Sequence, residues 1–126
     1  LFVENKVTVI GICLGMQILF ESSEEGACDG LGVLEGTVHR FDQNECHVGW
    51  NIVHTSQESV VENHSAYYFN HSYYVRCSSE LSLASTVHQR NFPAAVRHRK
   101  FYGFQFHPEK SQNAGAHLLK TIIGDF

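Results

Sequence analysis

The chain has 126 residues, 43% of them hydrophobic and 17% charged, and its formal net charge is −4. This composition is typical of one globular domain or part of one, and the negative balance gives no basic surface for nucleic acid. No apolar run reaches the length of a membrane span and no signal peptide heads the sequence, so neither a membrane protein nor a secreted one is expected.

The first expected element is a buried strand over residues 7–12, which leads directly into Gly11-Ile12-Cys13-Leu14-Gly15 and a short helix over residues 14–22. A nucleophile flanked by glycines, between a strand and a helix, is typical of a nucleophile elbow. The turn should be strained, so that only glycine fits on either side of the cysteine. We expect the helix N-terminus to lower the pKa of the Cys13 thiol, and the N–H of Leu14 to stabilise an oxyanion. The alternative is a buried structural cysteine.

The middle of the chain is predicted to be mostly strands. Glycines mark residues 26–36 as a loop, and polar residues mark 57–64 as another. The expected strands are 38–41, 48–54, 66–70, 73–77, 82–87, 94–97 and 102–106, with the basic residues 97–100 in a solvated hairpin. A last helix is expected over 111–123, with Ser111 as its N-cap and with Ala114, Leu118, Leu119 and Ile122 on one face. Strands enclosed by an elbow helix and a closing helix fit an α/β layer architecture.

The last strand runs into Phe104-Gln105-Phe106-His107-Pro108-Glu109, a second candidate motif. A cysteine nucleophile needs a base, and the base needs a partner that fixes its tautomer and orientation. His107 and Glu109 are two residues apart, a spacing at which both side chains can point the same way. We therefore predict that Cys13 is the nucleophile, His107 the general base and Glu109 its orienting partner. A lone structural histidine is the alternative.

The four cysteines (Cys13, Cys28, Cys46 and Cys77) form no CxxC pair, so no metal site is expected despite nine histidines. A disulfide framework is one interpretation of four cysteines. A reducing cytosol, with the three cysteines other than the nucleophile as small apolar fillers, is the favoured one.

Two segments, GICLGMQ at 11–17 and GFQFHPEKS at 103–111, resemble the signatures of class I glutamine amidotransferases, which hydrolyse glutamine and pass on ammonia. Residues 19–26, 30–41, 49–51 and 67–75 are similar to the HisH family, the glutaminase subunits of imidazole glycerol phosphate synthase in histidine biosynthesis. The resemblance spans about residues 9–119. It implies a class I glutamine amidotransferase-like fold, an α/β flavodoxin-like three-layer domain, in a cytoplasmic enzyme without a cofactor.

The resemblance also implies substrate contacts. It places Gln17 and the segment His71, Ser72 and Tyr73 against the substrate glutamine. Gln17 lies one helical turn beyond Cys13, so it can face the same pocket. From the residues alone, Gln17 could instead be an exposed helix residue, and the tyrosine-rich strands around 67–74 fit a core or an interface.

By the same resemblance, the partner is a HisF-like (β/α)8-barrel cyclase that receives the ammonia, and Trp50, Tyr68 and Lys110 lie at the docking face. Tryptophan and tyrosine are common interface anchors, although Trp50 could equally be a core residue. Two alternatives stay open: a HisH-like paralogue that supplies ammonia to another synthase, such as one that amidates a surface sugar, and a catalytically inactive binding module.

The start of the sequence carries one more expectation. Residue 1 is leucine, and the first strand already bears the candidate nucleophile. We expect residues 1–126 to be the C-terminal portion of an amidotransferase domain that is truncated at its N-terminus. The N-terminal strands would be missing, and with them the glycine-bearing loop that supplies the second oxyanion donor in the resembled family. On that basis the fragment alone should be nearly inactive, since the loss of one oxyanion donor costs about 3 kcal/mol.

Overall fold

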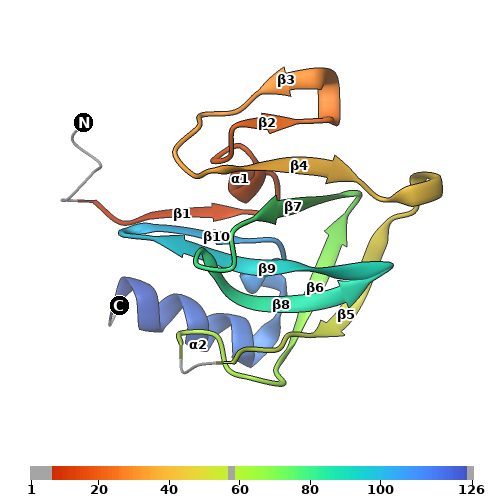
Figure 1. Ribbon diagram of the computed structural model, residues 1–126. Coiled ribbons are helices and arrows are strands. Elements are labelled where there is room, and N and C mark those ends of the chain that lie inside the picture. The colour runs from red at the N-terminus through yellow and green to blue at the C-terminus, as the bar shows by residue number, and fades with distance from the viewer. Residues whose placement is uncertain (1–6, 57–58, 125–126) are drawn as a thin grey trace.

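The structure is a computed structural model that describes residues 7–56 and 59–124, without the side chains of residues 27 and 28. A four-stranded sheet lies in the middle, with a long helix on one face and a second sheet on the other (Figure 1). The middle sheet has the order β1 (Val9–Ile12), β10 (Phe101–Phe104), β9 (Arg90–His98) and β8 (Ser82–His88). The expected layered α/β architecture is therefore present.

The pairing of β1 with β10 is what positions the site. These two strands are parallel, with Ile12 opposite Phe104, whereas β9 pairs antiparallel with both β10 and β8. Carboxyl ends of neighbouring parallel strands meet at one edge of a sheet. The segments that follow β1 and β10, which carry Cys13 and His107, therefore leave the sheet side by side.

The second sheet has the order β3 (Cys28–Asp29), β2 (Ser22–Ser23), β4 (Gly36–Arg40) and β7 (Tyr73–Cys77). Together with α1 (Leu14–Gln17), it covers one face of the middle sheet. The core between these layers is formed by Met16, Leu19, Phe20, Leu34, Val38, Val75, Val96 and Phe101.

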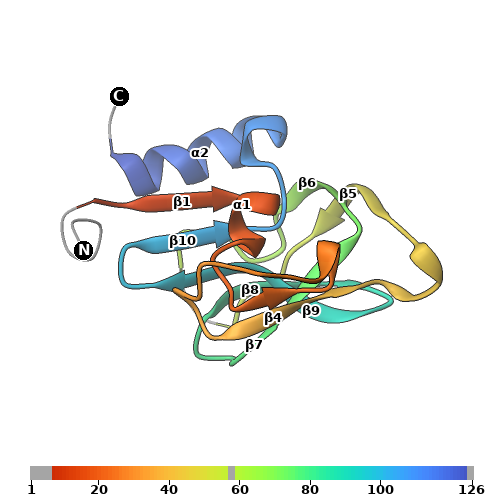
Figure 2. The same cartoon turned by 90° about the horizontal axis from the view of Figure 1, so that it is seen from above.

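Helix α2 (Gln112–Ile123) covers the opposite face and runs along β1 (Figure 2). Beside it lies a two-stranded ribbon of β5 (His47–Ile52) and β6 (Ala66–His71). Apolar side chains from the helix, the ribbon and the middle sheet form one cluster, which includes Val53, Tyr67, Phe69, Tyr102, Phe104, Phe106 and Leu118. Within the described residues, short 3-10 turns complete the order: η1 (Glu25–Ala27), η2 (Asp42–Asn44) and η3 (Pro108–Lys110).

The elbow helix is shorter than the sequence predicts, because α1 ends at Gln17 instead of residue 22. Beyond Gln17, backbone carbonyls accept hydrogen bonds from N–H groups outside the helix. The N–H groups of Leu31 and Leu34 donate to the carbonyls of Ile18 and Leu19 at 2.8 and 3.0 Å. A loop 30–34 that supplies these donors replaces further helical turns, so tertiary hydrogen bonding overrides helix propensity here.

Other local predictions also need correction. The expected loop at 26–36 contains the end of η1 and the short strand β3. Strand β9 begins at Arg90 and not at residue 94, because a tight turn at Gln89, with φ of 64°, pairs Arg90 directly with His88. Ser111 precedes α2 as predicted, but its hydroxyl makes no capping bond to the helix. The hairpin at 97–100 is confirmed, since β9 and β10 flank it.

Among the described residues the free cysteines are Cys13, Cys46 and Cys77. Cys77 is half-buried, as a filler would be, but Cys46 is exposed, so that part of the filler interpretation is wrong. The side chain of Cys28 lies outside the described residues, as do residues 57–58 of the predicted loop.

Candidate active site

Cys13 stands at the sharp turn between β1 and α1. Its backbone has φ of 56° and ψ of −107°, a conformation that L-residues rarely adopt. The Cys13 N–H donates to the carbonyl of Phe104 at 2.7 Å, which ties the turn to the end of β10. The strained strand-to-helix turn that the sequence predicts at Cys13 is therefore present.

Only one of the two flanking glycines is sterically required. A Cβ on Gly11 would lie 2.6 Å from the carbonyl carbon of Gly15 and 2.8 Å from the nitrogen of Met16. A Cβ on Gly15 would meet nothing within 4 Å. The expectation that both positions exclude a side chain is therefore right for Gly11 and wrong for Gly15.

The electrostatic surroundings of Cys13 also differ from the expectation. Burial raises the pKa of its thiol above the usual value, and the carboxylates of Glu109 and Glu25 raise it further. Hydrogen bonds from the N–H of Leu14 and from Gln105 lower this pKa without offsetting burial. Helix α1 has only four residues, so its dipole is weak. Cys13 is thus a protonated thiol at neutral pH and needs a base.

His107 and Glu109 form a close pair beyond β10. The Nδ1 of His107 lies 2.9 Å from Oε2 of Glu109, with 17% of the histidine side chain exposed. When Nδ1–H donates to the carboxylate, Nε2 is left unprotonated and able to accept a proton. The hydrogen bonds found among the described residues do not include one between Cys13 and His107.

The segment 107–111 is clamped to strand β6. The N–H of His107 donates to the carbonyl of Tyr68 at 2.8 Å, and the N–H of Tyr68 donates to Oγ of Ser111 at 3.0 Å. The Ser111 hydroxyl in turn donates to the carbonyl of His107 at 2.6 Å. Ser111 therefore holds the His107 segment in place, which explains why it does not cap α2.

A pocket of about 380 Å³ opens beside the Cys13 sulfur. All predicted substrate contacts line it together with Cys13 and Leu14, namely Gln17, His71, Ser72 and Tyr73. Gln17 is only 6% exposed, which rules out the interpretation as a solvent-facing helix residue. Its Nε2 donates to the carbonyl of Tyr73 at 3.3 Å and to Oε1 of Gln105 at 3.2 Å.

Three further residues of this pocket escaped the sequence analysis. Glu25, Arg40 and Asn70 line it, and they bring one negative and one positive side chain to its wall. The guanidinium of Arg40 donates to the hydroxyl of Tyr73 at 2.7 Å, and the carbonyl of Asn70 lies 3.6 Å from the Cys13 sulfur. Because these residues sit in segments remote from the two motifs, nothing in the local pattern singles them out.

Gln105 was also not predicted as a site residue, although the residues around it indicate that it is unusual. It is a polar residue between Phe104 and Phe106 and is completely buried. Its Nε2 lies 3.8 Å from the Cys13 sulfur. A buried amide that donates to sulfur stabilises the thiolate relative to the thiol.

The predicted docking residues gather on the outer side of the β5–β6 ribbon. Trp50 is 51% exposed and its ring lies 6.1 Å from that of Tyr68, the residue opposite it on β6. Lys110 is exposed within the turn that Ser111 and His107 fasten to Tyr68. Val48 and Ile52 extend the apolar stripe and were missed by the sequence analysis.

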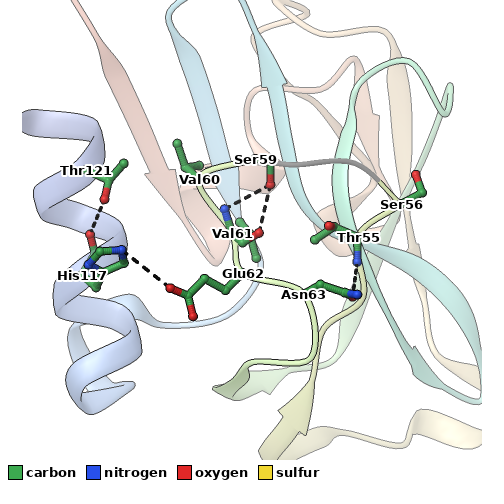
Figure 3. A pocket seen from close by; sticks show the side chains of 9 residues that line it. All are labelled: Thr55, Ser56, Ser59, Val60, Val61, Glu62, Asn63, His117 and Thr121. Carbon is green, nitrogen blue, oxygen red and sulfur yellow. Dashed lines mark hydrogen bonds and ion pairs between the residues drawn. The ribbon is translucent and has the colours of Figure 1, made fainter.

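A larger pocket, of about 530 Å³, lies between α2 and the segment before β6 (Figure 3). It is lined by Thr55, Ser56, Ser59, Val60, Val61, Glu62, Asn63, His117 and Thr121, and shares no residue with the Cys13 pocket. Glu62 and His117 approach to 3.7 Å across it. Its lining contains no cysteine, so pocket volume alone does not identify the candidate active site.

The described residues contain no group of three or more His, Cys, Asp or Glu side chains placed to hold a metal ion. Within the same part of the chain, no helix has both the length and the apolar character needed to cross a membrane.

Comparisons with known proteins bear on the fold and the family. Among solved structures, a glutamine amidotransferase superposes with a TM-score of 0.69 at 22% identity, over 98% of this chain and 64% of that one. A glutamine amidotransferase from Thermotoga maritima gives a TM-score of 0.58 at 19% identity, over 89% of this chain and 45% of that one. At these identities the likeness concerns the fold, and it confirms the predicted fold class.

Comparison by sequence finds relatives with higher identity than these structures. The imidazole glycerol phosphate synthase subunit HisH of Thermotoga maritima is 42% identical over 96% of this chain and 60% of the relative. The HisH subunits of Methanocaldococcus jannaschii and Leptospira borgpetersenii are 38% and 36% identical, over 96% and 97% of this chain and 65% and 66% of the relatives. The chain thus spans just under two thirds of the length of these curated relatives.

The family described as glutamine amidotransferase class-I matches residues 1–123, almost the whole chain. The elbow at Cys13 and the paired His107 and Glu109 lie within that match. This chain is a member of the class I glutamine amidotransferase family.

Proposed function

We propose that this chain carries the glutaminase centre of an imidazole glycerol phosphate synthase, the cytoplasmic enzyme that uses glutamine-derived ammonia in histidine biosynthesis. The proposal extends to the chain what the names of its HisH relatives say of them. The observation that carries it is the elbow cysteine at the end of β1, beside the strand that leads to the His107–Glu109 pair. Residues 1–126 would then belong to one amidotransferase domain.

The proposed mechanism is acyl transfer through a thioester. The Cys13 sulfur attacks the side-chain amide carbon of glutamine while its proton passes to Nε2 of His107. The N–H of Leu14, at the first position of α1, has no acceptor within the helix and stabilises the oxyanion. His107 then protonates the leaving ammonia. Water, deprotonated by His107, hydrolyses the thioester and releases glutamate.

Glutamine would occupy the pocket beside Cys13. Gln17, His71, Ser72 and Tyr73 would contact it, as the family resemblance implies. The two charged residues on the wall suit the two charges of a free amino acid: Glu25 its α-ammonium group and Arg40 its α-carboxylate. This match favours free glutamine over a glutamine side chain within a peptide.

The partner we propose is a HisF-like (β/α)8-barrel cyclase, bound through Val48, Trp50, Ile52, Tyr68 and Lys110. Val48, Trp50 and Ile52 are 59%, 51% and 45% exposed on one side of β5, an apolar stripe with an aromatic centre. Central aromatic residues dominate the binding energy of many interfaces. Binding of the partner to this ribbon would also affect the Cys13 pocket, because β6 contacts both motifs. The Tyr68 carbonyl accepts from the N–H of His107, and the Asn70 carbonyl lies 3.6 Å from the Cys13 sulfur.

Replacing Trp50 by Ala is expected to weaken binding to the cyclase partner about 30-fold, which corresponds to roughly 2 kcal/mol at an interface anchor. Isothermal titration calorimetry with the purified cyclase would measure the change. Leu31→Ala is the matched control, since Leu31 is 69% exposed but lies outside the β5–β6 ribbon. Equal losses in both variants would contradict the proposed docking face.

Genetic complementation tests the function itself. The full reading frame that contains this chain would be expressed in a histidine auxotroph lacking its own glutaminase, beside its Cys13→Ala variant. Growth that depends on Cys13 is the expected result. Glutamine hydrolysis without growth would point to a paralogue that serves another synthase. The absence of both would overturn the assignment in favour of an inactive binding module.

A further inference from the structure

Two buried histidines of the β5–β6 ribbon are hydrogen-bonded to each other, and one of them lines the Cys13 pocket. His47 on β5 and His71 on β6 are 5% and 6% exposed, and Nδ1 of His47 lies 2.8 Å from Nε2 of His71. Nε2 of His47 lies 3.0 Å from the amide nitrogen of Asn51, and Nδ1 of His71 lies 2.6 Å from the carbonyl oxygen of Tyr73. Both nitrogens of each ring are therefore engaged.

These contacts form a run of hydrogen bonds from Asn51 through His47 and His71 to Tyr73. The groups at its two ends fix which atom donates and which accepts at each step. A carbonyl oxygen only accepts, so His71 must carry its proton on Nδ1 and accept at Nε2. His47 must then donate from Nδ1 and accept the amide N–H of Asn51 at Nε2. Both imidazoles are thus neutral Nδ1–H tautomers, and a second proton on either ring would set two donors against each other.

The chain of hydrogen bonds continues beyond Tyr73 to the sulfur. The Tyr73 carbonyl also accepts from Nε2 of Gln17 at 3.3 Å, and the same amide nitrogen donates to Oε1 of Gln105 at 3.2 Å. Gln105 then directs its own Nε2 to the Cys13 sulfur at 3.8 Å. A single run of donors and acceptors therefore connects Asn51, beside exposed Trp50, with Cys13.

We propose that His47 is a positioning residue of the glutaminase site: its hydrogen bond to His71 holds the Tyr73 carbonyl, and through it Gln17 and the glutamine pocket, in the binding geometry. His47 does not line the pocket, so it acts only through His71. The interpretation of the pocket as a glutamine site rests on the proposed function. The hydrogen-bond chain itself does not.

The surroundings keep both rings neutral. Burial, together with the neighbouring His88, lowers the pKa of His47 to about 4. Burial also lowers the pKa of His71 to about 3, against the opposing effect of the Tyr73 carbonyl, and His47, His88 and His107 lower it further.

Aromatic rings enclose the pair, and charged side chains contact the neighbouring rings of His88 and Tyr74. Phe69 and His88 stack on His47 with centroids at 4.4 and 4.6 Å, and Phe41 and Phe92 contact both histidines edge-on or tilted. Glu45 approaches Nε2 of His88 to 3.9 Å, and Arg90 lies over the ring of Tyr74 and contacts Asp42 at 3.3 Å. Among the described residues, no hydrogen bond or ion pair links His47 or His71 to a carboxylate, so a protonated imidazole would lack a charged partner there.

Nitrogen-15 NMR of the uniformly labelled protein tests the hydrogen-bond chain directly. Both His47 and His71 should show the Nδ1–H tautomer and remain neutral from pH 8 down to pH 5. An Nε2–H tautomer at either ring, or titration of either near pH 6.5, would overturn the proposal. This result is independent of any activity.

Kinetics of two variants test the positioning role in the assembled enzyme. His47→Phe keeps a ring between Phe69 and His88 but removes the donor to His71, and should raise the KM for glutamine about tenfold with a smaller change in kcat. His47→Asn can place an N–H near the position of Nδ1 and should restore most of the affinity. Equal KM values in wild type and the Phe variant, or equal loss in both variants, would overturn the positioning role.

The outcomes separate this inference from the proposed function. A wild-type enzyme that does not hydrolyse glutamine would contradict the function, whatever the tautomers are. A wild-type enzyme that hydrolyses glutamine but shows the wrong tautomers would contradict only the role of His47.

Discussion

Replacing Cys13 by Ala is expected to reduce glutamine hydrolysis about ten-thousand-fold or more, the usual consequence of removing a covalent nucleophile. The pKa of this thiol is raised by burial, so the resting cysteine is protonated and reacts only when a base takes its proton. The Ala variant keeps the elbow backbone but has no atom that can form the thioester. Release of glutamate and ammonia, measured at saturating cyclase, gives the rate.

Cys77→Ala is the matched control for this experiment. Cys77 is also half-buried, and burial raises the pKa of its thiol to about 11, but it lies on β7 outside the Cys13 pocket. We expect this variant to keep nearly full activity. A Cys13→Ala enzyme with more than about a hundredth of the wild-type rate would refute the assignment of the nucleophile.

Gly11→Ala is expected to destabilise the fold by about 3 kcal/mol, at the upper end of the range for overpacking. The added Cβ would lie 2.6 Å from the carbonyl carbon of Gly15 and 2.8 Å from the nitrogen of Met16. These are backbone atoms of α1, so relief requires β1 and α1 to separate, and the Leu14 N–H would move with the helix. Equilibrium unfolding in urea would measure the loss.

Gly15→Ala is the internal comparison, because a Cβ there meets nothing within 4 Å and alanine favours a helix over glycine by up to about 1 kcal/mol. Its free energy of unfolding should equal or exceed that of the wild type, with an unchanged denaturant slope. Similar losses at Gly11 and Gly15 would mean that the packing of β1 on α1 is looser than the structure shows.

Local spacing was enough to predict the geometry of the two motifs. The glycine-flanked cysteine after an apolar run and the His-x-Glu spacing predicted the elbow and the His107–Glu109 pair, because each depends on residues within a few positions of one another. The apolar period of α2 likewise predicted a helix whose Leu118 is fully buried. The family resemblance added Gln17 and the segment 71–73, which the structure places in one pocket with Cys13.

The tertiary structure decides whether the two motifs lie close to each other. Parallel pairing of β1 with β10 brings Cys13 and His107 to neighbouring strand ends across more than ninety residues of sequence, while the loop at 30–34 ends α1 early. Trp50 is exposed, Ser111 clamps β6 instead of capping a helix, and burial raises the pKa of Cys13.

The tertiary structure also decides the hydrogen bonds that run from Asn51 through His47 and His71 to the pocket. Their partners come from different strands, and no single segment contains a pattern that pairs them. A sequence records which groups can donate, accept or ionise. Burial and hydrogen-bond partners are properties of the assembled layers, because both depend on segments that are distant in the chain and adjacent only after folding.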